Sequence, residues 1–299
     1  MNFPKDLIKG SVIPAETLAR HTSLGIGGPA AIWAQPRDVK ELKRVVVFAG
    51  ENNIPTLTLG GGTNVLISDG GFDGIVIHLG SPAFKNVSIS GTTVMVAAGH
   101  SVPRLVGLCC NTGLSGLESL VGIPGTVGGA VYINAGGWSS PLYKNISDYI
   151  ISLEVMDNEG KIKTLKKKDL AFGYRSSNLS SYVILEAALK LGREDVPLLV
   201  SRCSKFLKMK KGKQVLDMPS AGCVFKNPED FQFTAGQMID MLGLKGRIEG
   251  GAQISEKHAN FIINRKSAKC GDVLKLIDMV KKKVVDNYNV SLELEIKIV

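Results

Sequence analysis

Glycine clusters constrain this chain more than any other feature of its sequence. Three dense groups lie in the first half of the chain, at residues 25–28, 60–62 and 122–129. Glycine takes backbone conformations that other residues avoid, and without a side chain its backbone can approach a partner closely. Successive N–H groups in such turns form a nest that binds anions. The clusters are either tight turns or part of a binding site for an anionic ligand, and their density favours the binding site.

The spacing of these glycines excludes two common phosphate-binding motifs. A P-loop needs Gly-Lys followed by Ser or Thr at a fixed distance from its first glycine. No such lysine follows residues 60–62 or 122–129. A Rossmann fingerprint opens a helix, whereas residues 25–28 are followed by Pro29 and by an apolar run that predicts a strand. A glycine-lined anion site of another kind remains.

Hydrophobic periodicity predicts helices and strands that alternate without a regular βαβ array, which indicates an α+β fold. Helices are expected at residues 39–49, with Asp38 as N-cap, at 101–111, capped by Ser101, and at 234–242 and 272–288. Residues 200–217 are expected to form a basic helix and a connector. Strands are expected at residues 31–34, 56–59, 65–67, 74–79, 92–98, 151–156, 161–165, 182–189, 222–226, 260–264 and 292–299. We place a domain boundary near residue 195, where a basic helix follows a strand.

Charge and cysteine content narrow the functional classes. The net charge is +9, with lysine clusters at residues 161–168 and 205–213. A solvated face is the ordinary interpretation, and attraction of nucleotides and carboxylates is the functional one. Nucleic-acid binding is not expected, because no aromatic residues interleave with the lysines. The five cysteines include no CxxC pair, and no apolar run approaches the roughly 18 residues of a membrane span. We therefore expect a cytoplasmic protein without a membrane segment.

Six stretches lie in order along nearly the whole chain, at residues 21–28, 60–67, 122–129, 174–177, 221–228 and 257–261. Together they resemble the UDP-N-acetylenolpyruvoylglucosamine reductase family. Residues 21–28, 60–67 and 122–129 resemble its FAD-binding half, and residues 174–177, 221–228 and 257–261 resemble the rest. The glycine motifs alone indicate only the wider group of flavoproteins with this FAD-binding fold. The later motifs are specific to the reductase. The short segment between Tyr174 and Cys223 resembles the second form of the family, which lacks an extra tyrosine-bearing loop.

The resemblance implies a fold and a reaction. The fold has a two-part FAD-binding domain of the PCMH/vanillyl-alcohol-oxidase type at residues 1–195, split near residue 80, and a smaller α+β substrate-binding domain at residues 196–299. In the reaction NADPH reduces FAD, and the flavin then reduces the enolpyruvyl group of UDP-N-acetylglucosamine enolpyruvate. The product is UDP-N-acetylmuramate, a peptidoglycan precursor. The expected partner is this nucleotide sugar, and the expected state is a monomer.

Three residues are the predicted catalytic groups. A hydride added to the vinyl carbon leaves negative charge beside the carboxylate, so the site needs a cation and a neutral acid. The resemblance gives Arg175 as the cation and Cys223, where the family commonly has serine, as the proton donor. A thiol titrates near pH 8.5 and is mostly protonated at neutral pH. The last strand alternates, and the family pattern favours Glu295 over Glu293. The alternatives are a surface ion pair for Arg175, a small buried residue for Cys223 and a solvent face for the glutamates.

The same resemblance gives the binding residues. Predicted cofactor contacts are Gly60, Gly61, Gly62, Thr63, Asn64, Val65, Gly122, Ile123, Pro124, Gly125, Thr126, Gly128, Gly129, Ala130 and Asn134. Predicted substrate contacts are Tyr174, Lys226, Asn227, Lys257 and His258, and a structural hydrogen bond is an equal alternative for His258. No metal is assigned, because the other histidines have no ligand partner at helical spacing.

Two other functions stay open from the residues alone. One is an FAD-dependent oxidase of the same fold that acts on a sugar or an alcohol, often with a covalent flavin. The other is a basic nucleic-acid-binding protein, which would be colourless and would bind polynucleotides in a salt-sensitive way.

Overall fold

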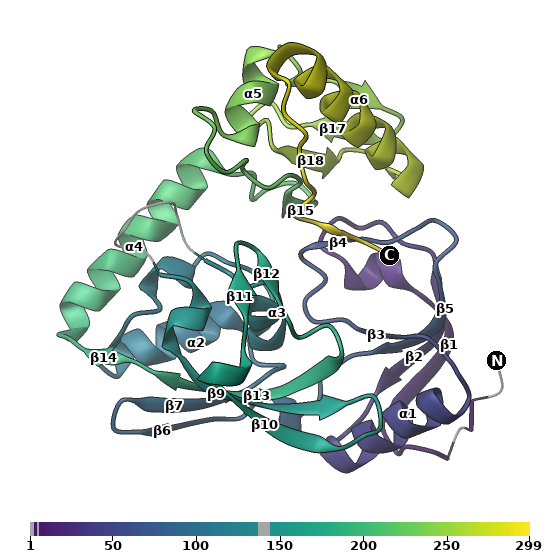
Figure 1. The fold of residues 1–299 in the computed structure, drawn as a ribbon, viewed down its shortest axis with the longest axis vertical. Helices are drawn as coiled ribbons and strands as arrows, with labels where there is room; N and C mark the ends of the chain where they lie inside the picture. Colours follow the sequence, from purple (N-terminus) through teal and green to yellow (C-terminus); the bar gives the residue numbers. More distant parts are fainter. Residues whose placement is uncertain (1–2, 5, 137–143) are drawn as a thin grey trace. The chain divides into compact units, whose positions relative to one another are not determined.

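A computed structural model describes residues 3–4, 6–136 and 144–299 of the chain, and these residues form two compact units (Figure 1). The first unit consists of Met1–Pro14, Ala31–Gly61 and Gly74–Lys210, and the second of Ala15–Ala30, Gly62–Asp73 and Lys211–Val299. Neither unit is a continuous piece of sequence, because the chain passes between them repeatedly. The predicted domain division near residue 195 and the split near residue 80 stay predictions.

The first unit contains a five-stranded antiparallel sheet. Its strands, in spatial order, are β10 (Ile162–Lys166), β9 (Ile150–Asp157), β13 (Tyr182–Lys190), β7 (Thr93–Ala97) and β6 (Val87–Ser90). Helices α2 (Val102–Asn111) and α3 (Val127–Tyr132) lie over one face of this sheet (Figure 1). Leu105 of α2, Val131 of α3 and Val155 of β9 are buried in one apolar core. The strands predicted at residues 151–156 and 161–165 are confirmed, and they pair with each other as an antiparallel hairpin.

A second sheet packs against α1 (Val39–Glu51). Its strands, in spatial order, are β1 (Ser11–Thr17), β2 (Pro29–Gln35), β5 (Phe72–Ile77) and β3 (Thr56–Thr58), and the β5–β3 pair is parallel. Asp38 caps α1 as predicted, since its carboxylate accepts a hydrogen bond from the Glu41 N–H at 2.9 Å. Ser101 stands at the N-cap position of α2 but makes no side-chain cap bond there.

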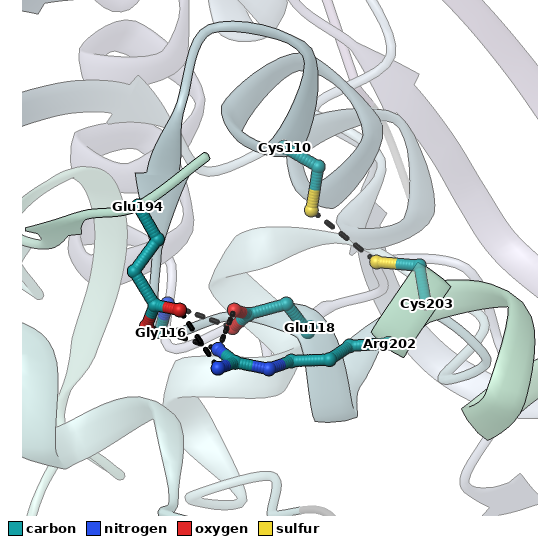
Figure 2. A network of polar contacts seen from close by, with 6 residues as sticks. All are labelled: Cys110, Gly116, Glu118, Glu194, Arg202 and Cys203. Atoms are coloured by element: carbon teal, nitrogen blue, oxygen red, sulfur yellow. Dashed lines mark hydrogen bonds and ion pairs between the residues drawn. The ribbon is translucent and has the colours of Figure 1, made fainter. Parts of the chain in front are cut away.

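A polar network and a pair of thiols connect helix α4 (Val196–Lys213) to other elements of the first unit (Figure 2). Arg202 of α4 binds the carboxylates of Glu194 at 2.7 Å and Glu118 at 3.4 Å. The Sγ atom of Cys203, one residue on, lies 3.2 Å from that of Cys110 on α2. All five cysteines are free thiols.

The second unit is a four-stranded sheet with two helices. The strands, in spatial order, are β15 (Ser220–Cys223), β18 (Phe261–Asn264), β17 (Ala252–Ile254) and β16 (Ile248–Glu249), and the helices are α5 (Ala235–Met241) and α6 (Cys270–Tyr288). Thr234 and Gln237 form a capping box at the start of α5. Helix α6 buries Ile277, Val280 and Val284 in the core of this unit, as its spacing predicts.

Short elements complete the fold. Two-stranded pairs join β8 (Leu114–Ser115) to β14 (Gly192–Arg193), β11 (Phe172–Gly173) to β12 (Ser176–Ser177), and β4 (Val65–Leu66) to β19 (Lys297–Ile298). Single turns of 3-10 helix lie at Leu18–His21, Pro82–Lys85, Glu118–Leu120, Ile146–Tyr149 and Lys167–Asp169. Among the described residues, no helix is both long and apolar enough to cross a membrane.

The predicted strand at residues 292–299 is wrong in its extent. Only Lys297–Ile298 is a strand, and it runs parallel to β4. The residues before it make a separate antiparallel contact, in which Glu295 N–H donates to Val224 O at 2.8 Å and Lys226 N–H donates to Glu293 O at 2.9 Å. The segment therefore changes partner in its middle, which the alternating pattern does not reveal.

The buried carboxylate of Glu41 makes the stability of the first unit depend on pH. Burial raises the pKa of this carboxyl, but hydrogen bonds from the N–H groups of Arg37, Lys9 and Gly10 outweigh it and hold the pKa below its ordinary value. A carboxyl whose pKa is lower in the folded state contributes stability that is lost as the pH falls through that folded pKa.

We expect Glu41→Gln to lower the free energy of unfolding at pH 7 by about 2 kcal/mol, because an amide cannot accept all three bonds as a carboxylate does. The acid-side loss of stability should also shrink in this variant. Urea titrations at several pH values measure both effects, with the exposed Glu51→Gln at the end of the same helix as control. Equal stability and an unchanged pH dependence in Glu41→Gln would contradict the assignment.

Candidate functional site

The two predicted cofactor segments, residues 60–65 and 122–130, contact each other through Gly60 and Thr126, which both belong to the first unit. A Cβ atom on Gly60 would collide with the Thr126 hydroxyl oxygen. That hydroxyl also caps α3, since it accepts a hydrogen bond from the Gly129 N–H at 3.3 Å. The glycine at position 60 is thus required by a contact between two loops that the sequence placed in one site.

Other glycines in these segments are required by internal packing or by their backbone conformation. A Cβ on Gly122 would lie 2.5 Å from the Lys210 side chain, and the Lys210 ammonium donates to Gly122 O. A Cβ on Gly128 would lie 2.9 Å from Ala98. Gly62 and Gly125 have φ values of 62° and 113°, which other residues rarely adopt. Part of the glycine pattern therefore serves the protein itself rather than the approach of a ligand.

The segments nevertheless fit an anionic dinucleotide such as FAD. Residues 60–65 and 122–130 contain no acidic side chain. Their turns present backbone N–H groups of the kind that bind phosphate. Lys210 brings an ammonium group against the second segment. From the sequence alone, Lys210 belongs to the lysine cluster at residues 205–213, for which a solvated face is the ordinary interpretation.

Arg175 lies at the tip of a two-residue turn between β11 and β12, next to Tyr174. Its φ is 54°, a left-handed conformation that is uncommon for a residue with a side chain. The guanidinium donates to Gly136 O at 3.4 Å and lies 5.4 Å from the centre of the Tyr174 ring. The side chain is thus held by neighbours in the first unit.

Two hydrogen bonds fasten this hairpin to the end of α3. The Asn134 amide donates to Gly173 O at 2.9 Å, and the Ser177 hydroxyl donates to Tyr132 O at 2.6 Å. Asn134 is only 4% exposed. Asn134 is a predicted cofactor contact, whereas Ser177 belongs to the motif at residues 174–177 and has no predicted role. In the structure both of their side chains bind protein backbone.

The segments that carry Cys223 and Glu295 are joined by backbone hydrogen bonds in the second unit. Cys223 ends β15, and the next residue, Val224, accepts the Glu295 N–H. The two predicted catalytic side chains are half-buried. Glu293 differs from Glu295: its side chain is 76% exposed, and its carboxylate pairs with Lys226 at 3.1 Å. The geometry therefore distinguishes two glutamates that the sequence pattern placed on one face.

The remaining predicted substrate residues have partners inside the second unit. The Asn227 side chain accepts the Ala235 N–H at 3.1 Å, and the Lys257 ammonium donates to Lys211 O at 2.6 Å. His258 Nδ1 accepts the Asn260 N–H at 3.2 Å. Burial, together with the charge of nearby Lys245, lowers the pKa of His258 and favours the neutral ring.

Asn260 belongs to the motif at residues 257–261, and the structure shows that its role is structural. It is 3% exposed, and its side chain bonds both backbone groups of Phe225, with distances of 2.9 Å and 2.8 Å. This pair of bonds fixes the backbone that follows Cys223. Among the described residues, no group of three or more His, Cys, Asp or Glu side chains could hold a metal ion.

One family model and one solved structure indicate the type of fold. Residues 30–166 match the family model described as "FAD binding domain". The structure of 6-hydroxy-D-nicotine oxidase from Arthrobacter nicotinovorans shares the fold, with a TM-score of 0.51 and 19% identity over 64% of this chain and 44% of that one. These likenesses agree with the predicted type of FAD-binding fold.

The family follows from more specific matches. Residues 214–299 match the model described as "UDP-N-acetylenolpyruvoylglucosamine reductase, C-terminal domain". Reductases of that name from Moorella thermoacetica and Anoxybacillus flavithermus are each 39% identical, over 97% of this chain and 94% and 95% of theirs. The structure of the Thermus caldophilus reductase matches with 34% identity and a TM-score of 0.82, over 97% of this chain and 99% of that one. The chain belongs to the UDP-N-acetylenolpyruvoylglucosamine reductase family, and the predicted resemblance and α+β fold are confirmed.

Proposed function

We propose that this chain carries out the reaction of its family with Arg175, Cys223 and Glu295 as catalytic residues. The chain is an oxidoreductase that uses NADPH and FAD to reduce the enolpyruvyl group of UDP-N-acetylglucosamine enolpyruvate. The product, UDP-N-acetylmuramate, serves peptidoglycan synthesis. The observation that carries the residue assignment is the backbone pairing of residues 224–226 with residues 293–295, which places the backbone of Glu295 beside the residue that follows Cys223.

The chemistry divides between the cofactor and the side chains. FAD, when bound and reduced, supplies a hydride for the double bond. Arg175 binds the substrate carboxylate through its planar guanidinium and stabilises the negative charge that develops beside it. The Cys223 thiol donates a proton to the carbon that carries this charge. Glu295 assists this proton delivery, since its segment is hydrogen-bonded to the residue after Cys223.

The binding roles extend over both parts of the chain. Residues 1–195 bind FAD through the two glycine segments, and residues 196–299 bind the nucleotide sugar. Lys226 and Lys257 attract its diphosphate, which agrees with the net charge of +9. Tyr174, Asn227 and His258 complete the substrate contacts. The enzyme works as a monomer in the cytoplasm, without nucleic-acid or membrane partners.

Cys223→Ser should stay active, whereas Cys223→Ala should lose the second half of the reaction. Serine retains a proton that can be donated, and alanine has none, so reoxidation of the reduced flavin by substrate should slow by about 100-fold or more in the alanine variant. Flavin reduction by NADPH should be unchanged in both variants. Stopped-flow absorbance measures the two steps separately. Normal substrate-driven reoxidation in Cys223→Ala would exclude Cys223 as the donor.

Glu295→Gln should reduce turnover far more than Glu293→Gln. Glu293 is exposed and makes a surface ion pair with Lys226, which contributes at most about 1 kcal/mol. Glu295 is half-buried beside the segment of Cys223, and the loss of its charge should slow turnover by about 100-fold. Steady-state NADPH oxidation with saturating substrate compares the two variants. Equal turnover in both would show that the wrong glutamate was chosen.

A further inference from the structure

Two asparagines from the predicted FAD-binding segments use their side chains to hold other backbone segments. Asn134 is buried, and its amide nitrogen donates to Gly173 O at 2.9 Å. Asn64 is half-buried, and its amide nitrogen donates to Glu295 O at 3.0 Å. Each acceptor belongs to a segment that carries a proposed catalytic residue. Both asparagines are predicted cofactor contacts.

Helix α3 links the second glycine segment to the Arg175 hairpin. Thr126 and the following glycines form its N-terminal end, and Asn134 lies just beyond its C-terminal end. The helix has six residues and is therefore about 9 Å long. The Asn134 side chain donates a hydrogen bond to one strand of the hairpin. On the other strand, the Ser177 hydroxyl donates to Tyr132 O at 2.6 Å. The hairpin is thus fixed on both sides to one short, rigid element.

Asn64 makes an equivalent link in the second unit. Its side chain donates to Glu295 O, and its own carbonyl accepts the Lys297 N–H at 3.0 Å. These two bonds bracket Glu295 and Ile296 on the C-terminal segment. The parallel pairing of β4 with β19 begins at the next residue, Val65. The backbone at Glu295 is therefore set directly by the first glycine segment.

We propose that Asn134 and Asn64 are positioning residues that fix Arg175 and Glu295 relative to the FAD-binding segments. This inference rests on the proposed function, because it assumes the roles given to Arg175 and Glu295. A displacement of about 1 Å in a catalytic group can slow a reaction by about 100-fold. Arg175 needs such support, since it sits at a turn with a left-handed φ of 54° on strands of two residues each.

Asparagine is the residue type that these two positions require. Position 134 has a φ of 48°, and asparagine tolerates this conformation better than most residues. Both acceptors are carbonyl oxygens, so the side chain must donate. Aspartate keeps the shape but directs an acceptor at the carbonyl. Asn134→Asp and Asn64→Asp therefore remove the hydrogen bond with the smallest change in volume.

The test separates FAD binding from the two half-reactions in the flavin-loaded enzyme. In Asn134→Asp and Asn64→Asp saturated with FAD, we expect flavin reduction by NADPH to stay within about twofold of the unchanged enzyme. Reoxidation of the reduced flavin by UDP-N-acetylglucosamine enolpyruvate should slow by about 10- to 100-fold. Ser177→Ala removes the second hydrogen bond that holds the hairpin, at a residue that is not a predicted cofactor contact. This variant should show the same selective loss as Asn134→Asp.

Double variants test whether each asparagine acts through its catalytic partner. Adding Asn134→Asp to Arg175→Lys, or Asn64→Asp to Glu295→Gln, should slow reoxidation by less than twofold beyond the catalytic variant alone, because the pairs act as units. Weakened FAD binding with normal reoxidation at saturating FAD, or additive losses in the double variants, would overturn the inference. Failure of the unchanged enzyme to be reoxidised by this substrate would instead overturn the proposed function.

Discussion

The second unit depends on backbone hydrogen bonds made by the last residues of the chain. Glu295 N–H donates to Val224 O, Lys297 N–H to Asn64 O, and Val299 N–H to Leu66 O. These bonds join residues that are more than 70 and more than 230 positions apart in the sequence. The glycine segment at residues 62–65, the end of β15 and the C-terminal segment are thereby held together. The neighbourhood of Cys223 and Glu295 is a consequence of this arrangement.

Local signals in the sequence predict the elements whose packing is also local. Helix α1 has a capping aspartate and apolar residues at helical spacing, and the structure confirms both. The strand β1 escaped prediction because most of its residues are exposed, and it contains Pro14 followed by Ala15 with a φ of 53°. The C-terminal segment alternates over its whole length, yet Ile298 is 42% exposed. Alternation shows that a segment is extended, but it does not show which partner each residue meets.

The reaction could be predicted from the sequence, whereas the contacts of individual site residues could not. The family resemblance, confirmed by full-length relatives, gives the reaction, and it suggests which side chains carry it. The sequence could not show why individual loop residues are needed. Gly60 is required by the hydroxyl of Thr126, and Asn134 bonds to Gly173, 39 positions away. Such contacts depend on the tertiary arrangement. A motif that is predicted to bind the cofactor can therefore also align the catalytic residues.

In this enzyme, electrons pass from NADPH through bound FAD to the enolpyruvyl double bond. The most direct measurement is anaerobic: the flavin-loaded protein is first reduced with one equivalent of NADPH and then mixed with UDP-N-acetylglucosamine enolpyruvate. We expect the flavin absorbance to bleach on the first addition and to return only on the second, with UDP-N-acetylmuramate as product. A protein that binds no FAD, or a reduced flavin that this substrate does not reoxidise, would contradict the account.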